Sequence, residues 1–198
     1  HNLGEVVDAC CAYIDNPEIT VEELMQYVKG PDFPTGGIIQ GRQGIKDAFE
    51  TGRGRIVIRS KTDIEVSDSG RETIVVTEIP YMVNKREMIE KIAELVESKK
   101  IEGIAYINDE TTMKGVRIVI RLKKDANSNV VLNMLYKYSP LQSSFSVNNV
   151  ALVNGRPRTL NLKDLIKYFV KHRHEVIVRR TKFDLDKAQK RAHILEGL

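Results

Sequence analysis

The sequence has little cysteine and no apolar segment long enough to cross a membrane. Its two cysteines, Cys10 and Cys11, are adjacent. On a helix, neighbouring side chains point about 100° apart, so we expect no structural disulfide, and a reducing cytoplasm is favoured. No run approaches the roughly 20 apolar residues of a membrane span, and the N-terminus has no signal-peptide pattern. These absences argue against a secreted disulfide scaffold and against a membrane protein.

Motifs for nucleotide and metal chemistry are also missing. No Walker A sequence and no GxGxxG follows a predicted strand. His172 and His174 are two residues apart, which on a helix separates them by about 200°, so they cannot share a metal ion. Asp109 and Glu110 lie in a polar turn with no apolar surroundings to shift their pKa values, and we interpret them as solvated loop acids. We therefore predict neither a catalytic residue nor a metal site in this chain.

What the sequence does contain is an ordinary balance for a folded domain. Of its 198 residues, 41% are hydrophobic and 29% charged, which suits a soluble protein with a buried core. The net charge of +4 is compatible with a polyanionic partner. Because the chain starts at His1 without a methionine and ends within a helical pattern, we expect an internal segment of a longer protein.

Helix and strand patterns mix over the first 160 residues. Capping residues predict helices that start at Asn2, Thr20 and Asn84, and helical patterns also cover 43–50 and 129–138. Apolar and β-branched runs predict strands, at 38–39, 55–66, 71–79, 101–108, 116–122, 142–153 and 156–160. Tight turns at 68–70 and 154–155 make antiparallel hairpins. The pattern predicts an α+β fold with antiparallel or mixed sheets, rather than a doubly wound parallel sheet.

The last segment is expected to be one long helix. Asn161 can cap it, and no helix breaker follows before Gly197, which gives a rod of about 50 Å. Apolar residues recur every seven positions, at Leu162, Phe169, Val176 and Phe183, and a stripe in shifted phase continues at Leu185, Ala188, Ala192 and Leu195. This repeat predicts pairing with another helix. The basic residues between 171 and 191 are either solubilising or in contact with DNA.

Three arginines on glycine-containing turns are candidate phosphate ligands. Arg42 lies between Gly41 and Gly44, while Arg53 and Arg55 flank Gly54. Exposed guanidinium groups can bind phosphate oxygens with two parallel hydrogen bonds. The alternative is that they are ordinary solubilising arginines, and the residues alone leave both open.

Several longer motifs occur in an order typical of one family. They are His1-Asn2-Leu3, Gly30-Pro31-Asp32-Phe33-Pro34-Thr35-Gly36-Gly37, Gly41 with Gly44-Ile45, Thr51-Gly52-Arg53-Gly54, Glu78-Ile79-Pro80-Tyr81, Asn108-Asp109-Glu110, Arg117-Ile118-Val119-Ile120, Asn161-Leu162-Lys163-Asp164 and the run 191–198. Over essentially its whole length the chain resembles the A subunits of bacterial type IIA topoisomerases. Asn154-Gly155-Arg156-Pro157 resembles the gyrase branch more than topoisomerase IV.

The resemblance implies an ATP-dependent enzyme that cuts one duplex, passes another through it and reseals the cut. The family's nucleophile is a tyrosine that directly follows an arginine and becomes joined to a 5′ phosphate. None of the seven tyrosines here follows an arginine, so the nucleophile is expected upstream and the chain alone is expected to be inactive. The resemblance places ATP and Mg²⁺ in the gyrase B subunit. The partners it implies are double-stranded DNA, the B subunit, and a second copy of the A subunit in an A2B2 heterotetramer, located in the bacterial cytoplasm at the nucleoid.

The resemblance also implies a division of the chain. Residues 1–29 would be a helical lead-in from the DNA-cleavage domain, 30–160 a two-layer α/β tower domain, and 161–198 the start of a long coiled-coil helix. The tower would contact DNA phosphates rather than base edges, with Arg42, Arg53 and Arg55 as the proposed contacts. Three alternatives remain: the equivalent piece of topoisomerase IV, a self-contained nucleic-acid-binding module, and a coiled-coil structural unit.

Overall fold

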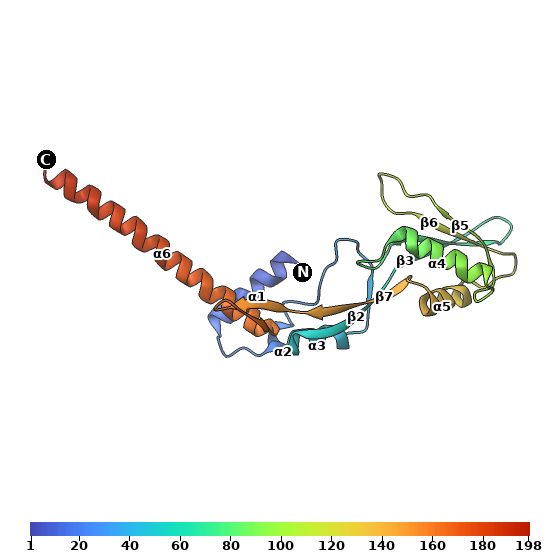
Figure 1. Cartoon of the computed structure of the whole chain (residues 1–198), viewed down its shortest axis with the longest axis horizontal. Coiled ribbons are helices and arrows are strands. Elements are labelled where there is room, and N and C mark those ends of the chain that lie inside the picture. The colour runs from blue at the N-terminus through green and yellow to red at the C-terminus, as the bar shows by residue number, and fades with distance from the viewer. The chain divides into compact units, whose positions relative to one another are not determined.

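The computed structural model describes all residues from 1 to 198 (Figure 1). The chain divides into two compact units that are each assembled from separated segments. The first contains His1–Gly30, Ala48–Arg53 and Asn148–Leu198, and the second contains Pro31–Asp47 and Gly54–Val147. Helices and antiparallel sheets occur together, so the α+β fold class is confirmed. The division at residues 29 and 160 stays a prediction. No helix is both long and apolar enough to cross a membrane.

The first unit is mainly helical. It contains α1 (Leu3–Asp15), α2 (Val21–Leu24), the hairpin of β8 (Val150–Val153) and β9 (Arg156–Thr159), and α6 (Leu162–Glu196). The predicted capping box at Thr20 is present. At α1 only half of the predicted box forms, because the Asn2 side chain accepts from the Glu5 amide but the Glu5 carboxylate accepts from the Lys29 amide at 3.1 Å instead. That bond ties the loop after α2 to the start of α1.

Helix α6 confirms the expected long helix. The Asn161 side chain caps it by accepting from the Asp164 amide at 2.8 Å. Its first turns pack against α1 and α2, and Leu162 and Ile166 are buried there. Beyond Val178 every residue is exposed, so the distal part of the helix has no partner within this chain.

The second unit contains a two-layer α/β arrangement. Strands β3 (Lys61–Val66), β4 (Glu72–Glu78), β6 (Ile118–Leu122) and β5 (Ile104–Asp109) form an antiparallel sheet in that order. Helices α4 (Lys85–Glu97) and α5 (Ser128–Tyr138) pack on one face of it (Figure 1). Strand and helix side chains form one buried cluster there, including Ile74, Ile120, Met88, Ile92 and Leu135.

A smaller sheet has the order β1 (Ile38–Gln40), β2 (Arg53–Arg59), β7 (Gln142–Asn148), with α3 (Gln43–Thr51) between β1 and β2 in sequence. The predicted strand 55–66 is wrong as one strand. Ser60 divides it into β2 and β3, which belong to different sheets, and the Ser60 amide donates to Leu141 at 2.9 Å.

The predicted strand 142–153 is also divided, into β7 and β8, at Asn149. The Asn149 amide donates to the Gly52 carbonyl at 2.8 Å, and its carbonyl accepts from the Leu160 amide at 2.9 Å. Its backbone groups are therefore bound by two other segments of the first unit, and the ladder of β7 does not continue through it.

Candidate nucleic-acid interface

Strand β2 has one buried and one outward side. Ile56 and Ile58 are 2% and 1% exposed, whereas Arg55 is exposed and Arg59 half-buried. Because side chains alternate along a strand, Arg55, Val57 and Arg59 lie on the same outward side. Arg53, the first residue of β2, follows the same alternation and is exposed, but it belongs to the first compact unit.

The pairing of β1 with β2 places residues of β1 on the same outward side as Arg59 and Val57. Ile38 pairs with Arg59 and Gln40 with Val57, and residues directly opposite each other share a face of a sheet. Strand β1 ends at Gln40 and Gly41 follows with a φ of 75°, so this register does not extend to Arg42. Of the three predicted phosphate ligands, Arg55 lies within β2 and Arg42 lies just before α3, both in the second unit.

Gly44 shows how closely this corner is packed. A Cβ built on Gly44 would overlap the carbonyl group of Arg55, and its next neighbour is the Ile56 Cα. The first turn of α3 therefore lies directly against the backbone of β2, which only glycine permits here. Arg42 immediately precedes α3, so this contact fixes its backbone beside Arg55.

Arg59 is a member of the site that sequence reasoning missed. Its Nε donates to Gln142 Oε1 at 2.6 Å, and its guanidinium carbon lies 4.4 Å from the centre of the Tyr136 ring. A sequence signal was present, because Arg59 continues the alternation of Arg53 and Arg55 along one strand.

The Arg59–Gln142 bond also shows which side of β7 faces outward. Gln142 lies on the same side as Arg59, and by alternation Ser144 and Ser146 follow it. Both serines are exposed. We call this side the outer face of the small sheet; it carries the polar residues Gln40, Arg55, Arg59, Gln142, Ser144 and Ser146 together with Ile38 and Val57, and Arg42 lies beside it at the start of α3.

The three strands that form the outer face have no acidic residue to neutralise its arginines. Strands β1, β2 and β7 contain no Asp or Glu, and neither does helix α5. The chain has 27 acidic residues, yet none falls between positions 126 and 163. Arg42, Arg55 and Arg59 form no ion pair. A surface of this kind attracts polyanions, and its hydroxyl and guanidinium donors match phosphate oxygens.

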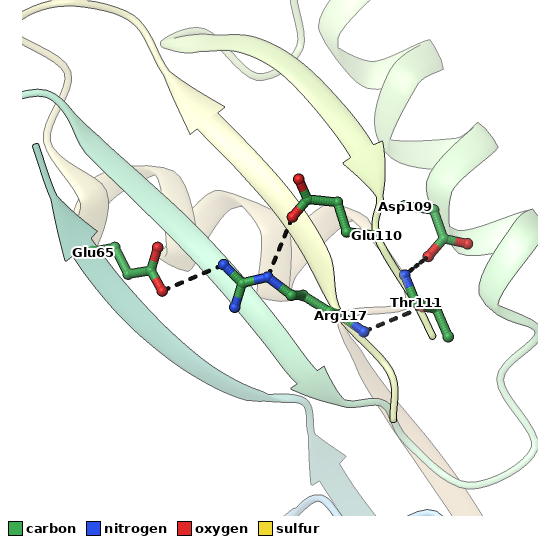
Figure 2. Close-up of polar contacts among 5 residues, drawn as sticks. All are labelled: Glu65, Asp109, Glu110, Thr111 and Arg117. Atoms are coloured by element: carbon green, nitrogen blue, oxygen red, sulfur yellow. Dashed lines mark hydrogen bonds and ion pairs between the residues drawn. The ribbon is translucent and has the colours of Figure 1, made fainter. Parts of the chain in front are cut away.

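A second polar cluster lies at the β5–β6 hairpin of the larger sheet (Figure 2). Asp109 Oδ2 lies 2.9 Å from Lys85 Nζ, and Oδ1 accepts from the Thr111 amide at 3.0 Å. Arg117 reaches Glu110 at 3.2 Å and Glu65 at 3.4 Å. Both carboxylates are exposed, as expected for solvated acids, and each in addition has a cationic partner that the sequence did not predict.

The charge interactions in these pairs stabilise the fold rather than supply a reactive group. The hydrogen bonds from Thr111 and Lys85 lower the pKa of Asp109 to about 2, and the bond to Glu110 raises the pKa of Arg117. A carboxyl group with so low a pKa stays ionised at neutral pH and is a poor proton donor. The cluster holds the hairpin to α4 and β3, and its geometry offers no general acid.

The first unit has an apolar groove of about 390 Å³ between α1 and α6. Its lining includes Leu3, Val6 and Cys10 from α1 and Leu165, Ile166 and Phe169 from α6. Burial, with a smaller effect of Cys11, raises the pKa of the Cys10 thiol. Cys10 therefore stays protonated at neutral pH and is a poor nucleophile, and both cysteines are free, as expected.

Comparison with known proteins identifies the family of the chain. The family model of the DNA gyrase/topoisomerase IV A subunit matches residues 1–198. The chain therefore belongs to the family of DNA gyrase/topoisomerase IV A subunits, and the predicted resemblance is confirmed.

Within that family its similar relatives are DNA gyrase A subunits. Those of Clostridium acetobutylicum, Pseudomonas aeruginosa and Escherichia coli are 57%, 58% and 56% identical to it over 198, 199 and 199 residues. The matches cover 100% of this chain but only 22–24% of the relatives. The chain thus spans about a quarter of their length, and the gyrase branch is favoured over topoisomerase IV.

Proposed function

We propose that this chain is the part of a DNA gyrase A subunit that supports duplex DNA on the outer face of the small sheet. The observation that carries the proposal is that Arg42, Arg55 and Arg59 form no ion pair, beside three strands that contain no Asp or Glu. Phosphates of a duplex would supply the missing negative charge, and counterions released from the DNA would favour binding.

The side chains of the outer face favour contact with the DNA phosphates over recognition of the bases. Guanidinium groups bind phosphate oxygens through paired hydrogen bonds, and the hydroxyls of Ser144 and Ser146 can donate to further oxygens. We expect affinity for bent or straight duplex with little sequence preference.

The activity of the whole protein is a further part of this proposal. Family membership supports a type IIA DNA topoisomerase that uses ATP and supercoils DNA, with a B subunit that holds ATP and Mg²⁺ and a second A subunit in an A2B2 heterotetramer. Such an assembly would act on the bacterial nucleoid in the cytoplasm. The 198-residue chain, which has no tyrosine directly after an arginine, is proposed to be inactive alone.

A DNA titration of the chain tests the proposed surface. A labelled duplex of about 30 base pairs is titrated by fluorescence anisotropy between about 50 and 200 mM salt. Removing two phosphate contacts in Arg42→Ala/Arg55→Ala should flatten the slope of log K against log salt by about 1.8.

The matched control is Arg86→Ala/Lys91→Ala, which removes the same charge from α4, where both residues already pair with glutamates. It should leave the slope unchanged. Equal slopes for the control and the arginine variant, or no binding by the unchanged chain at the lowest salt, would overturn the proposal.

A further inference from the structure

The small sheet and the larger sheet of the second unit have separate cores. The buried cluster of the larger sheet gathers side chains from β4, β5, β6, α4 and α5, and it contains no residue of β1, β2 or β7. Ile56 and Ile58 of β2 are also buried, but they lie outside that cluster. No ion pair involves a residue of the three strands of the small sheet. The two sheets are therefore packed separately.

The chain passes between these two sheets at only two places. Ser60 joins β2 to β3, and residues 139–141 join α5 to β7. The two crossings are adjacent, because the Ser60 amide donates to the Leu141 carbonyl at 2.9 Å. Directly after Ser60, the pairing of β3 with β4 shifts register between Lys61 and Thr62, and such an irregularity lets a strand bend. Hinges in proteins commonly consist of a few residues at the ends of elements, as here.

Three aromatic rings join the two sheets away from the crossings. The ring centre of Phe145 in β7 lies 5.4 Å from that of Tyr81, which follows β4. Phe33, in the loop before β1, contacts both rings, at 5.5 Å from Phe145 and 5.2 Å from Tyr81. Because Gln142 points outward, Phe145 three residues later points to the inner side of the small sheet. The aromatic contact is therefore on the side opposite the outer face.

A single contact of another kind joins the sheets on the outer side. The Arg59 guanidinium of β2 lies 4.4 Å from the centre of the Tyr136 ring in α5. Aromatic pairs and exposed cation–π contacts are each weak compared with the burial of a core side chain. Contacts of this strength can break while both cores stay intact.

We propose that Ser60 and Leu141 form a hinge between the small sheet and the larger sheet, and that Phe33, Tyr81 and Phe145 form an aromatic clasp that holds the hinge closed. Opening the clasp lets the outer face turn relative to the larger sheet, and it separates no residues of the buried cluster. This inference goes beyond the proposed function and does not depend on DNA binding by the outer face.

Distances between spin labels measure whether the two sheets move. Arg42→Cys places a label beside the small sheet and Ala93→Cys places one on α4, in a chain whose own cysteines are replaced by Cys10→Ala and Cys11→Ala. Both label positions are exposed. Double electron–electron resonance on the 198-residue chain should give one narrow distance distribution. Phe145→Ala should add a second distance, because loss of the ring contacts raises the ratio of open to closed chains by up to about tenfold.

Matched variants separate the clasp and the hinge from a general loosening of the fold. Phe145→Tyr keeps the ring and should keep the narrow distribution. Ser60→Gly and Ser60→Ala both remove the buried hydroxyl, but only glycine frees the backbone, so only Ser60→Gly should broaden the distribution. A second label pair, Ala93→Cys with Asn133→Cys, joins α4 to α5 on the larger sheet and should stay narrow in every variant.

Each contrary outcome overturns a named part of the inference. An unchanged distribution in Phe145→Ala would refute the clasp, and an unchanged distribution in Ser60→Gly would refute the hinge. Broadening in Ser60→Ala equal to that in Ser60→Gly would show that the hydroxyl, and not the backbone, sets the angle. Equal broadening of the pair on α4 and α5 would show a loosened fold in place of a hinge. The salt slopes that test the proposed function are independent of all these results.

Discussion

Two buried serines of the second unit differ in what their hydroxyl groups bind. Ser60 is 2% exposed, and its Oγ has no hydrogen-bond partner. Ser139 is 7% exposed, and its Oγ donates to the Leu135 carbonyl at 2.7 Å and accepts from the Leu141 amide at 3.1 Å. An unsatisfied buried polar group costs about 1–3 kcal/mol, whereas a satisfied one contributes about 1 kcal/mol.

Opposite effects on stability follow for these two positions. Ser60→Ala should raise the free energy of unfolding by about 1 kcal/mol, because it removes a desolvated hydroxyl that binds nothing. Ser139→Ala should lower it by about 1–2 kcal/mol, because it also leaves the Leu141 amide without its acceptor. Urea unfolding followed by circular dichroism measures both. A lower midpoint for Ser60→Ala would show that its hydroxyl has a partner in solution.

At the level of single residues, part of the candidate site could be predicted from the sequence. Arg42 and Arg55 were identifiable because each lies beside glycine in a turn or at the start of a strand, which is local information. Ser144 and Ser146 were not, because their direction follows from the Arg59–Gln142 bond, which joins residues 83 positions apart. The pairing of Asp109 with Lys85 was missed for the same reason, since nothing near either residue specifies the other.

Among the elements, helices were predicted better than strands. Asn2, Asn84 and Asn161 each cap a helix with a side-chain bond to a residue three positions on, and such a signal is complete within four residues. The strand breaks at Ser60 and Asn149 were missed because both residues lie in runs typical of extended backbone. What ends each strand is its partner segment elsewhere in the chain, and periodicity carries no information about that.

The ion pair between Asp109 and Lys85 joins the end of β5 to the start of α4, and it predicts a pH dependence. The pKa of Asp109 in the folded chain is about 2, below its ordinary value of 3.8. A lowered pKa means that the ionised carboxylate stabilises the folded state. This contribution is fully present well above pH 4 and is lost as the pH falls through 4 towards 2.

Thermal unfolding at about pH 6 and about pH 3 measures this contribution. Asp109→Asn should be less stable than the unchanged chain at the higher pH, and the difference should shrink at the lower pH. Lys85→Met should behave in the same way, since it removes the other partner. Other carboxyl groups titrate in both chains, so the comparison is made between chains at each pH. A difference that stays constant with pH would mean that the pair does not stabilise the fold.

For the molecule as a whole, the distribution of charge is more informative than its total. Helix α6 contains ten Lys and Arg residues against five Asp and Glu, whereas the entire chain has a net charge of only +4. The same helix exposes large apolar side chains, with Phe183 at 68%, Leu185 at 55% and Leu195 at 60%. Apolar burial would favour pairing of two such helices, and the shared positive charge would oppose it.

Repulsion should win at low salt, so we expect the chain to sediment as a 22.5 kDa monomer at about 10 µM and about 0.1 M salt. Raising the salt to about 1 M shortens the screening length from about 10 Å to about 3 Å, and self-association should then increase. Phe183→Ser/Leu195→Ser should abolish that increase, because it removes the apolar contact. A stable dimer at low salt would instead identify α6 as a self-sufficient coiled-coil unit. A chain that stays monomeric at every salt concentration would show that this apolar stripe needs a different helix as its partner.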